Sequence, residues 1–166
     1  SGTMVREKTK MEKMLISGVA ADKNVAKIRV AGLGNDPEST FRLLNLLDRN
    51  NLNIDVMIQS LGKDGTKSVS FTVAKPDMLR TIDVLNDNKD LLGIKKLDYD
   101  ENVAKVSVIG AGVRSHSGVA AKMFGALANA GINTEMVTTS EIRITALIDE
   151  AYADQAMRAI HETFLE

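Results

Sequence analysis

The sequence predicts an α+β fold of two ferredoxin-like βαββαβ units, each with a four-stranded antiparallel sheet and both helices on one face. An eleven-residue segment ending in Gly-x-Gly occurs twice, at 24–34 and 102–112, with seven of eleven residues identical. After each copy the same order of segments follows. First comes a segment with apolar residues at helical spacing, then two segments in which apolar and polar residues alternate as in strands, and then a second segment with helical spacing. A chain of 166 residues has room for two small domains, which favours a shared interface or an oligomer.

The first unit is predicted over 25–100. Alternating β-branched residues indicate strands, Asp36-Pro37 is a typical helix start, and Gly62 to Gly65 suits a hairpin turn. The expected elements are a strand at 25–33, a helix with Phe41, Leu43, Leu44, Leu46 and Leu47 inward, strands around 54–58 and 69–73, a helix after Pro76 with Met78, Leu79, Ile82 and Leu85 inward, and a strand over 91–99.

The second unit is predicted over 101–166, joined by residues 14–24. Its expected elements are a strand at 103–110, a loop at 113–118, a helix with Val119, Met123, Leu127 and Ala130 inward, strands at 132–139 and 142–148, and a helix from 152 or 153 with Ala156, Ile160 and Phe164 inward. No final strand follows, whereas the strand-like run 14–20 is spare. Because an open sheet edge is a pairing hazard, we expect this run to cross over and complete the second sheet.

Composition narrows the function classes. The net charge is -1 without a basic block, which argues against nucleic-acid binding, and the absence of Cys excludes disulfides and thiolate chemistry. No apolar run approaches the roughly 18 residues of a membrane span, and the polar N-terminus lacks the apolar region of a secretion signal. We expect a cytoplasmic protein that contacts neither membrane nor nucleic acid.

Catalytic and metal-binding patterns are weak. His116 has no second His or Cys nearby for a metal, and no acid in its loop to orient it toward Ser115 or Ser117, while His161 falls in a polar helix position. The glycines of 110–118 lack the spacing of nucleotide-binding loops. The sequence therefore predicts no catalytic residue, no metal site and no cofactor in this chain.

Small-ligand binding suits the two glycine-ended loops better. Each runs into a helix N-terminus, where free N–H groups favour a carboxylate. Acceptors for an ammonium group lie beside them: Asp36, Asp55 and Gln59 in the first unit, and Glu135 and Glu141 in the second. Simpler roles stay open, since Asp36 can serve only as a cap, Asp55 and Glu135 as exposed strand residues, and Asn53 and Asn133 as turn formers.

Three motifs resemble the regulatory region of aspartokinase, a family with tandem ACT domains of this βαββαβ type. They are Ser17-Gly18-Val19-Ala20-Ala21-Asp22-Lys23, the segment Val108 to Val119 with Ser115-His116-Ser117-Gly118, and Thr139-Ser140-Glu141-Ile142-Arg143-Ile144. The resemblance covers nearly the whole chain, and it implies that residues 1–13 are a linker from the kinase domain.

The resemblance also implies two effector sites between ACT units of paired chains. The first would use Asn35, Asp36, Thr40, Asn53, Ile54, Asp55 and Gln59, and the second Ser117, Gly118, Val119, Asn133, Thr134, Ser140 and Glu141. One residue departs from the family pattern, which has Pro-Gly where this chain has Pro37-Glu38. The Glu38 carboxylate either repels an effector carboxylate or points to solvent.

The implied function is feedback regulation by lysine, threonine or both. The chain itself would not be an enzyme, whereas its parent would be an aspartate kinase that uses ATP and Mg²⁺ to phosphorylate the side-chain carboxylate of aspartate. The expected partners are the effector, a second copy in a homodimer, and the catalytic domain or subunit. The alternative is an ACT-type amino-acid sensor attached to a different enzyme.

Overall fold

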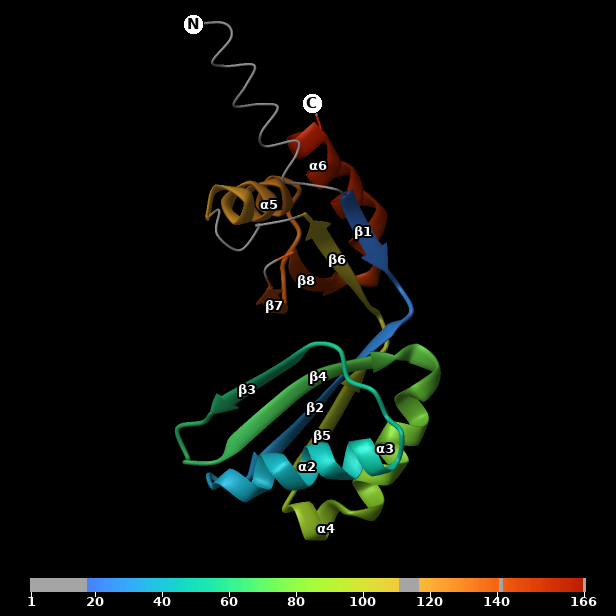
Figure 1. The fold of residues 1–166 in the computed structure, drawn as a ribbon, viewed down its shortest axis with the longest axis vertical. Coiled ribbons are helices and arrows are strands. Elements are labelled where there is room, and N and C mark those ends of the chain that lie inside the picture. Colours follow the sequence, from blue (N-terminus) through green and yellow to red (C-terminus); the bar gives the residue numbers. More distant parts are fainter. Residues whose placement is uncertain (1–17, 111–116, 141, 166) are drawn as a thin grey trace, which may run out of the picture. The chain divides into compact units, whose positions relative to one another are not determined.

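A computed structural model describes residues 18–110, 117–140 and 142–165, which divide into two compact units (Figure 1). The unit called first here comprises residues 24–102. The second comprises the described parts of 1–23 and 103–166. The predicted α+β class is confirmed, because each unit carries a four-stranded antiparallel sheet and helices.

The first unit has the sheet order β3-β4-β2-β5, with every neighbouring pair antiparallel. Helices α2, α3 and α4 lie on one face of this sheet (Figure 1). The elements are β2 (Val25–Leu33), α2 (Pro37–Arg49), β3 (Met57–Leu61), β4 (Lys67–Ala74), η1 (Lys75–Asp77), α3 (Met78–Asp87), α4 (Lys89–Leu92) and β5 (Lys96–Asp100).

The second unit repeats this plan, with one strand taken from the other end of the chain. Its sheet order is β1-β6-β8-β7, and β1 pairs antiparallel with β6 from Gly18 opposite Ile109 to Asp22 opposite Lys105. Residues 18–20 of the spare run thus lie in the fourth strand of the second sheet, while residues 14–17 lie outside the described residues. The elements are β1 (Gly18–Asp22), β6 (Val103–Ile109), α5 (Ser117–Asn129), β7 (Met136–Thr139), β8 (Arg143–Asp149), η3 (Glu150–Tyr152) and α6 (Ala153–Leu165).

Each unit has its own apolar core between sheet and helices. In the first, Ile28, Val30 and Phe71 from the sheet meet Leu43 and Leu47 of α2, all of them buried. The core of the second unit contains the predicted residues Val119, Met123, Leu127, Ala156, Ile160 and Phe164. The 3.6-residue period therefore placed the inward face of α5 and α6 correctly.

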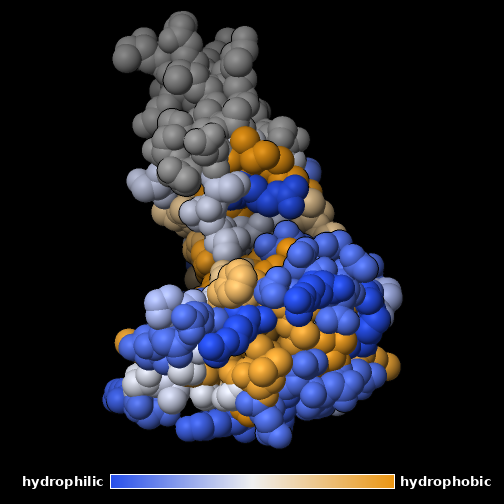
Figure 2. Space-filling view, turned by 60° about the horizontal axis from the view of Figure 1, so that its bottom comes forward, coloured by the Kyte–Doolittle hydropathy of each residue, from blue (hydrophilic) through white to orange (hydrophobic). Residues whose placement is uncertain are grey.

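Two apolar residues predicted to face inward are exposed instead. Phe41 is 65% exposed and Leu79 is 68% exposed. Leu43 and Leu47, four residues apart, point at the sheet, and Phe41 lies two residues before Leu43, about 200° around the helix. Leu79 follows the buried Met78 by about 100°. Figure 2 shows hydrophobic surface between hydrophilic residues on the first unit.

Three strand boundaries differ from prediction. The run 91–99 contains the end of α4, and Gly93 stops that helix in the left-handed region at φ 74°, so β5 begins only at Lys96. The strands expected from 54 and 132 begin at Met57 and Met136. Short apolar runs do not reveal where hydrogen bonding to a neighbouring strand starts, because loop residues such as Val56 are buried as well.

Gly32 is required where β2 leaves the sheet. The register between β2 and β4 shifts between Ala31 and Leu33, and Gly32 has φ 86°. A Cβ at Gly32 would lie 2.5 Å from the Cβ of Lys95, whose N–H donates to the Ala31 carbonyl. This bulge re-aims the chain toward the loop that starts α2.

Candidate functional site

The loop before α2 is organised around Asp36. Its Oδ1 accepts hydrogen bonds from the N–H groups of Glu38 (3.0 Å) and Ser39 (2.9 Å), and its Oδ2 accepts one from the Ser39 hydroxyl (2.9 Å). These hydrogen bonds, the one from the Ser39 hydroxyl most of all, hold the pKa of Asp36 below its usual 3.8. Asp36 is therefore an ionised, exposed helix cap, which is the simpler of the two roles left open by the sequence.

The cap changes what this helix N-terminus can bind. Two of the N–H groups that would attract an effector carboxylate are already used by Asp36. An incoming group therefore meets a carboxylate first, which favours a cation such as an α-ammonium group. Glu38 forms a 3.2 Å ion pair with Arg42 on the exposed side of α2. The positive charge of Arg42 offsets part of the repulsion that the Glu38 carboxylate would exert on an effector carboxylate.

Lys67 brings a positive charge to the same loop. Its Nζ donates to the main-chain carbonyl of Asp36 at 2.9 Å, from the first residue of β4. Sequence reasoning did not single out Lys67, because nothing in the hairpin sequence shows that β4 starts opposite the end of β2. The loop thus presents an acidic side chain and an ammonium group within one exposed surface.

Thr40 and Gln59 connect the helix to the edge strand. The hydroxyl of Thr40 donates to the side-chain oxygen of Gln59 on β3. Both residues were predicted for the first site, and the structure brings them together beside the exposed residues Asn35 and Asp36.

The remaining first-site residues lie elsewhere in the unit. Asn53, Ile54 and Asp55 follow the end of α2, a helix of 13 residues that is about 20 Å long. Asp55 precedes Gln59 by four residues, about 13 Å along an extended chain. Within one unit, therefore, Asn53 to Asp55 and the cap of α2 sit at opposite ends.

The second unit has the same division. Ser117 and Gly118 are exposed in the first turn of α5, and Ser140 directly follows β7, with its N–H donating to the Arg143 carbonyl at 2.8 Å. Asn133 and Thr134 precede β7 at the other end. The Val119 side chain is buried in the core, so only its main chain can face a ligand. Glu141 and His116 lie outside the described residues.

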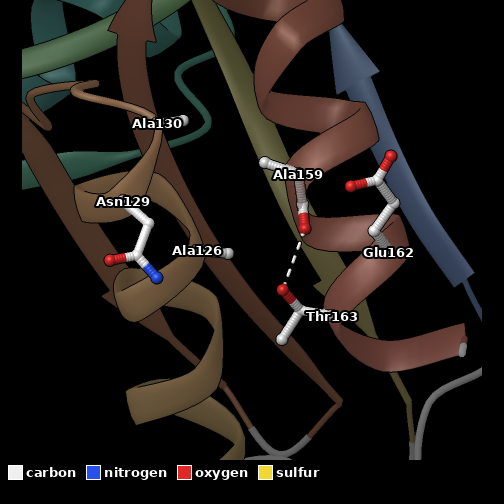
Figure 3. A pocket seen from close by; sticks show the side chains of 6 residues that line it. All are labelled: Ala126, Asn129, Ala130, Ala159, Glu162 and Thr163. Atoms are coloured by element: carbon white, nitrogen blue, oxygen red, sulfur yellow. Dashed lines mark hydrogen bonds between the residues drawn. The ribbon is translucent and has the colours of Figure 1, made fainter.

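One hollow in the described surface lies on the helices of the second unit. It is a groove of about 360 Å³ between α5 and α6 (Figure 3). Its walls are Ala126, Ala130 and Ala159, with Thr163 donating to the Ala159 carbonyl at 2.9 Å. Asn129 and Glu162 complete its lining, so the groove offers a carboxylate but no cationic side chain for the carboxylate of an amino acid.

Within 18–110, 117–140 and 142–165 there is no cluster of three or more His, Cys, Asp or Glu residues that could hold a metal ion. His161 is exposed on α6. In the same ranges no helix is long and apolar enough to cross a membrane.

Comparison with known proteins gives consistent results. Residues 106–164 match the family described as ACT domain. The chain is 37% identical to an aspartokinase of Pseudomonas aeruginosa over 166 residues, covering 98% of this chain and 40% of that protein. This chain spans about 40% of the length of the curated relatives that it matches.

Two examples show that solved structures match this chain over nearly their whole length. One is the aspartokinase alpha and beta subunits, at 41% identity and a TM-score of 0.84, covering 91% of this chain and 99% of the other. The other is the ligand-free regulatory subunit of aspartate kinase from Thermus thermophilus, at 33% identity and a TM-score of 0.85, covering 90% and 99%.

Proposed function

Because this chain belongs to the aspartokinase family, as a regulatory region of ACT domains, we propose that it binds lysine, threonine or both as feedback effectors. The observation that carries this proposal is the match to a separate regulatory subunit, of which the chain covers 99%. The parent activity is then ATP- and Mg²⁺-dependent phosphorylation of aspartate by a catalytic domain or subunit outside this chain. Residues 1–13 would be the linker from that domain.

The ligand chemistry of the loop before α2 supports an α-amino acid. The ionised Asp36 suits an ammonium group, and the Nζ of Lys67, 2.9 Å from the Asp36 carbonyl, suits a carboxylate. Thr40 and Gln59 add a hydroxyl and an amide beside them. A zwitterion matches both charges of the loop, whereas a simple anion or cation matches one.

The sheet edges support self-association. The edge strand β5 (Lys-Leu-Asp-Tyr-Asp) carries three charges, a common protection against pairing. The opposite edge strands, β3 (Met-Ile-Gln-Ser-Leu) and β7 (Met-Val-Thr-Thr), carry none. We therefore expect a homodimer in which β3 and β7 are the pairing edges.

Antiparallel pairing of these edges would also complete the sites. The start of an edge strand in one chain then lies beside the end of an edge strand in the other. The loops Asn53–Asp55 and Asn133–Thr134 of one copy would thus approach the helix starts of its partner. This arrangement explains why the predicted site residues occupy opposite ends of a single unit.

A mixing experiment tests ligand binding and the shared site together. An isotope-labelled chain with Asn53→Ala and Asn133→Ala is refolded alone or with excess unlabelled, unsubstituted chain. Alone, its Ser39 amide signal should not respond to lysine or threonine, because both partner loops are altered. In mixed dimers the response should return. A response that is absent in mixed dimers, but present in the unsubstituted labelled chain, would place each site within one chain and contradict the shared arrangement.

Linkage then provides the regulatory mechanism. A ligand that binds one arrangement of paired ACT units more tightly shifts the population toward that arrangement. If the catalytic domain is less active there, effector binding inhibits it. The effect on the kinase is limited to the difference in effector affinity between the two arrangements.

A further inference from the structure

The segment from Asn53 to Asp55 is exposed yet held at both ends. It connects α2 with the edge strand β3, and Asn53 and Asp55 themselves are exposed. Two residues outside the predicted site, Thr72 on β4 and Arg80 on α3, bond to the main chain on either side of it. Neither residue was singled out by its sequence.

Thr72 holds the downstream end through an irregularity in the β3–β4 ladder. The Thr72 carbonyl accepts from the Asp55 N–H (3.1 Å), while the Thr72 N–H donates to the Val56 carbonyl (2.9 Å). Two consecutive residues, Asp55 and Val56, thus lie opposite the single residue Thr72, which is the arrangement of a β-bulge. In a β-bulge one main-chain group has no hydrogen-bond partner in the neighbouring strand's main chain. That group is the Val56 N–H, and the Thr72 hydroxyl accepts its hydrogen bond at 3.0 Å.

Arg80 holds the upstream end at the C-terminus of α2. Its guanidinium donates to the carbonyls of Asn50 (2.6 Å) and Asn51 (3.3 Å), and the Asp77 carboxylate lies 3.6 Å from the nitrogen that donates to Asn51. Terminal helix carbonyls lack intrahelical partners, and a cation there also opposes the helix dipole. Asn51 has φ 55°, a conformation that a residue other than glycine adopts only when its surroundings fix it.

We propose that Thr72 and Arg80 are positioning residues for an α-amino-acid effector, and that they fix the Asn53–Asp55 segment before the ligand arrives. The inference rests on the proposed function of this segment. Thr72 is fully buried, so its hydroxyl cannot touch a ligand and acts only through the segment. Fixing a binding loop in advance lowers the entropy lost on binding, which raises affinity without adding a contact.

Three substitutions separate positioning from general stability. Thr72→Val removes the hydroxyl, leaves the buried Val56 N–H unpaired and should raise the effector Kd about tenfold. Thr72→Ser keeps the hydroxyl and should restore the affinity. The matched control is Thr145→Val, because Thr145 is also buried in a sheet but its hydroxyl bonds to Ser107 at 2.9 Å in the other unit.

Arg80 is tested by its geometry as well as its charge. Arg80→Lys keeps the positive charge but cannot bond two carbonyls with one planar group. It should therefore raise the logarithm of the effector Kd by about half as much as Arg80→Met does. Equal affinity in Arg80→Met and the unsubstituted chain would remove Arg80 from the proposal.

The test combines calorimetric titration of lysine and threonine with amide hydrogen exchange on the ligand-free chain. We expect Thr72→Val to speed exchange at Asp55 and Val56 and to raise Kd, while Thr72→Ser and Thr145→Val leave both measurements near those of the unsubstituted chain. Unchanged Kd in Thr72→Val would overturn the proposal. Binding of neither amino acid by the unsubstituted chain would refute the effector function instead, and exchange at Val56 would still decide whether Thr72 holds the segment.

Discussion

Replacing Gly32 by alanine should destabilise the first unit strongly, for two separable reasons. At φ 86° an alanine incurs the left-handed penalty of about 1–2 kcal/mol. Its Cβ would also lie 2.5, 2.6 and 2.8 Å from the Cβ, Cγ and Cδ of Lys95. Because the Lys95 Cβ is attached to the main chain, relief requires moving the start of β5 and weakening the 2.9 Å bond from the Lys95 N–H to the Ala31 carbonyl.

Two further glycines isolate these contributions. Gly65, at φ 81°, has open space where a Cβ would stand, with no atom within 4 Å, so Gly65→Ala should cost only the backbone penalty of about 1–2 kcal/mol. Gly125 lies within α5 with open space beside it, and Gly125→Ala should stabilise the second unit by about 0.5–1 kcal/mol. Adding a lost hydrogen bond and steric displacement, Gly32→Ala should cost about 3 kcal/mol or more.

Urea unfolding followed by circular dichroism measures these differences, since the chain has no Trp to report by fluorescence. Amide hydrogen exchange then assigns each loss to one unit. A cost for Gly32→Ala within about 0.5 kcal/mol of that for Gly65→Ala would refute the close approach of Lys95, because only the shared backbone penalty would remain.

Three other perturbations follow from the structure. Phe71→Ala should cost about 3–5 kcal/mol and reduce exchange protection in the first unit, because Phe71 is fully buried in that core; equal losses in both units would contradict separate cores. Deleting residues 1–22 removes β1 and should reduce amide protection most in β6, its pairing partner; unchanged protection there would contradict the crossover. Ionised Asp36 should stabilise the fold above about pH 3.8, and this contribution should vanish as pH falls through its lowered folded-state pKa; Asp36→Asn should show a correspondingly weaker loss of stability between about pH 5 and pH 2.

Local chemistry made much of the fold predictable. Asp36 and Pro37 start α2 as expected, because a short acceptor side chain and a fixed φ suit a helix start in any context. The repeat of 24–34 at 102–112 placed β2 and β6 in corresponding positions, and the missing last strand pointed to β1. These inferences depend on local sequence or on comparing the two copies.

Tertiary contacts decided what the sequence did not reveal. The exposure of Phe41 and the late start of β5 depend on how each helix turns toward its sheet and where a strand finds its neighbour. In the candidate site, Lys67 and Thr72 act on residues 31 and 16 positions away, at Asp36 and Val56. Their roles follow from strand register, and no spacing within the sequence encodes it.

Calorimetric titration of the purified chain with lysine and threonine, separately and together, tests the regulatory assignment most directly. We predict saturable binding of at least one of them, weakened when Asp55 is replaced by alanine. A folded, dimeric sample that takes up neither amino acid would contradict the proposal that this region is the effector sensor.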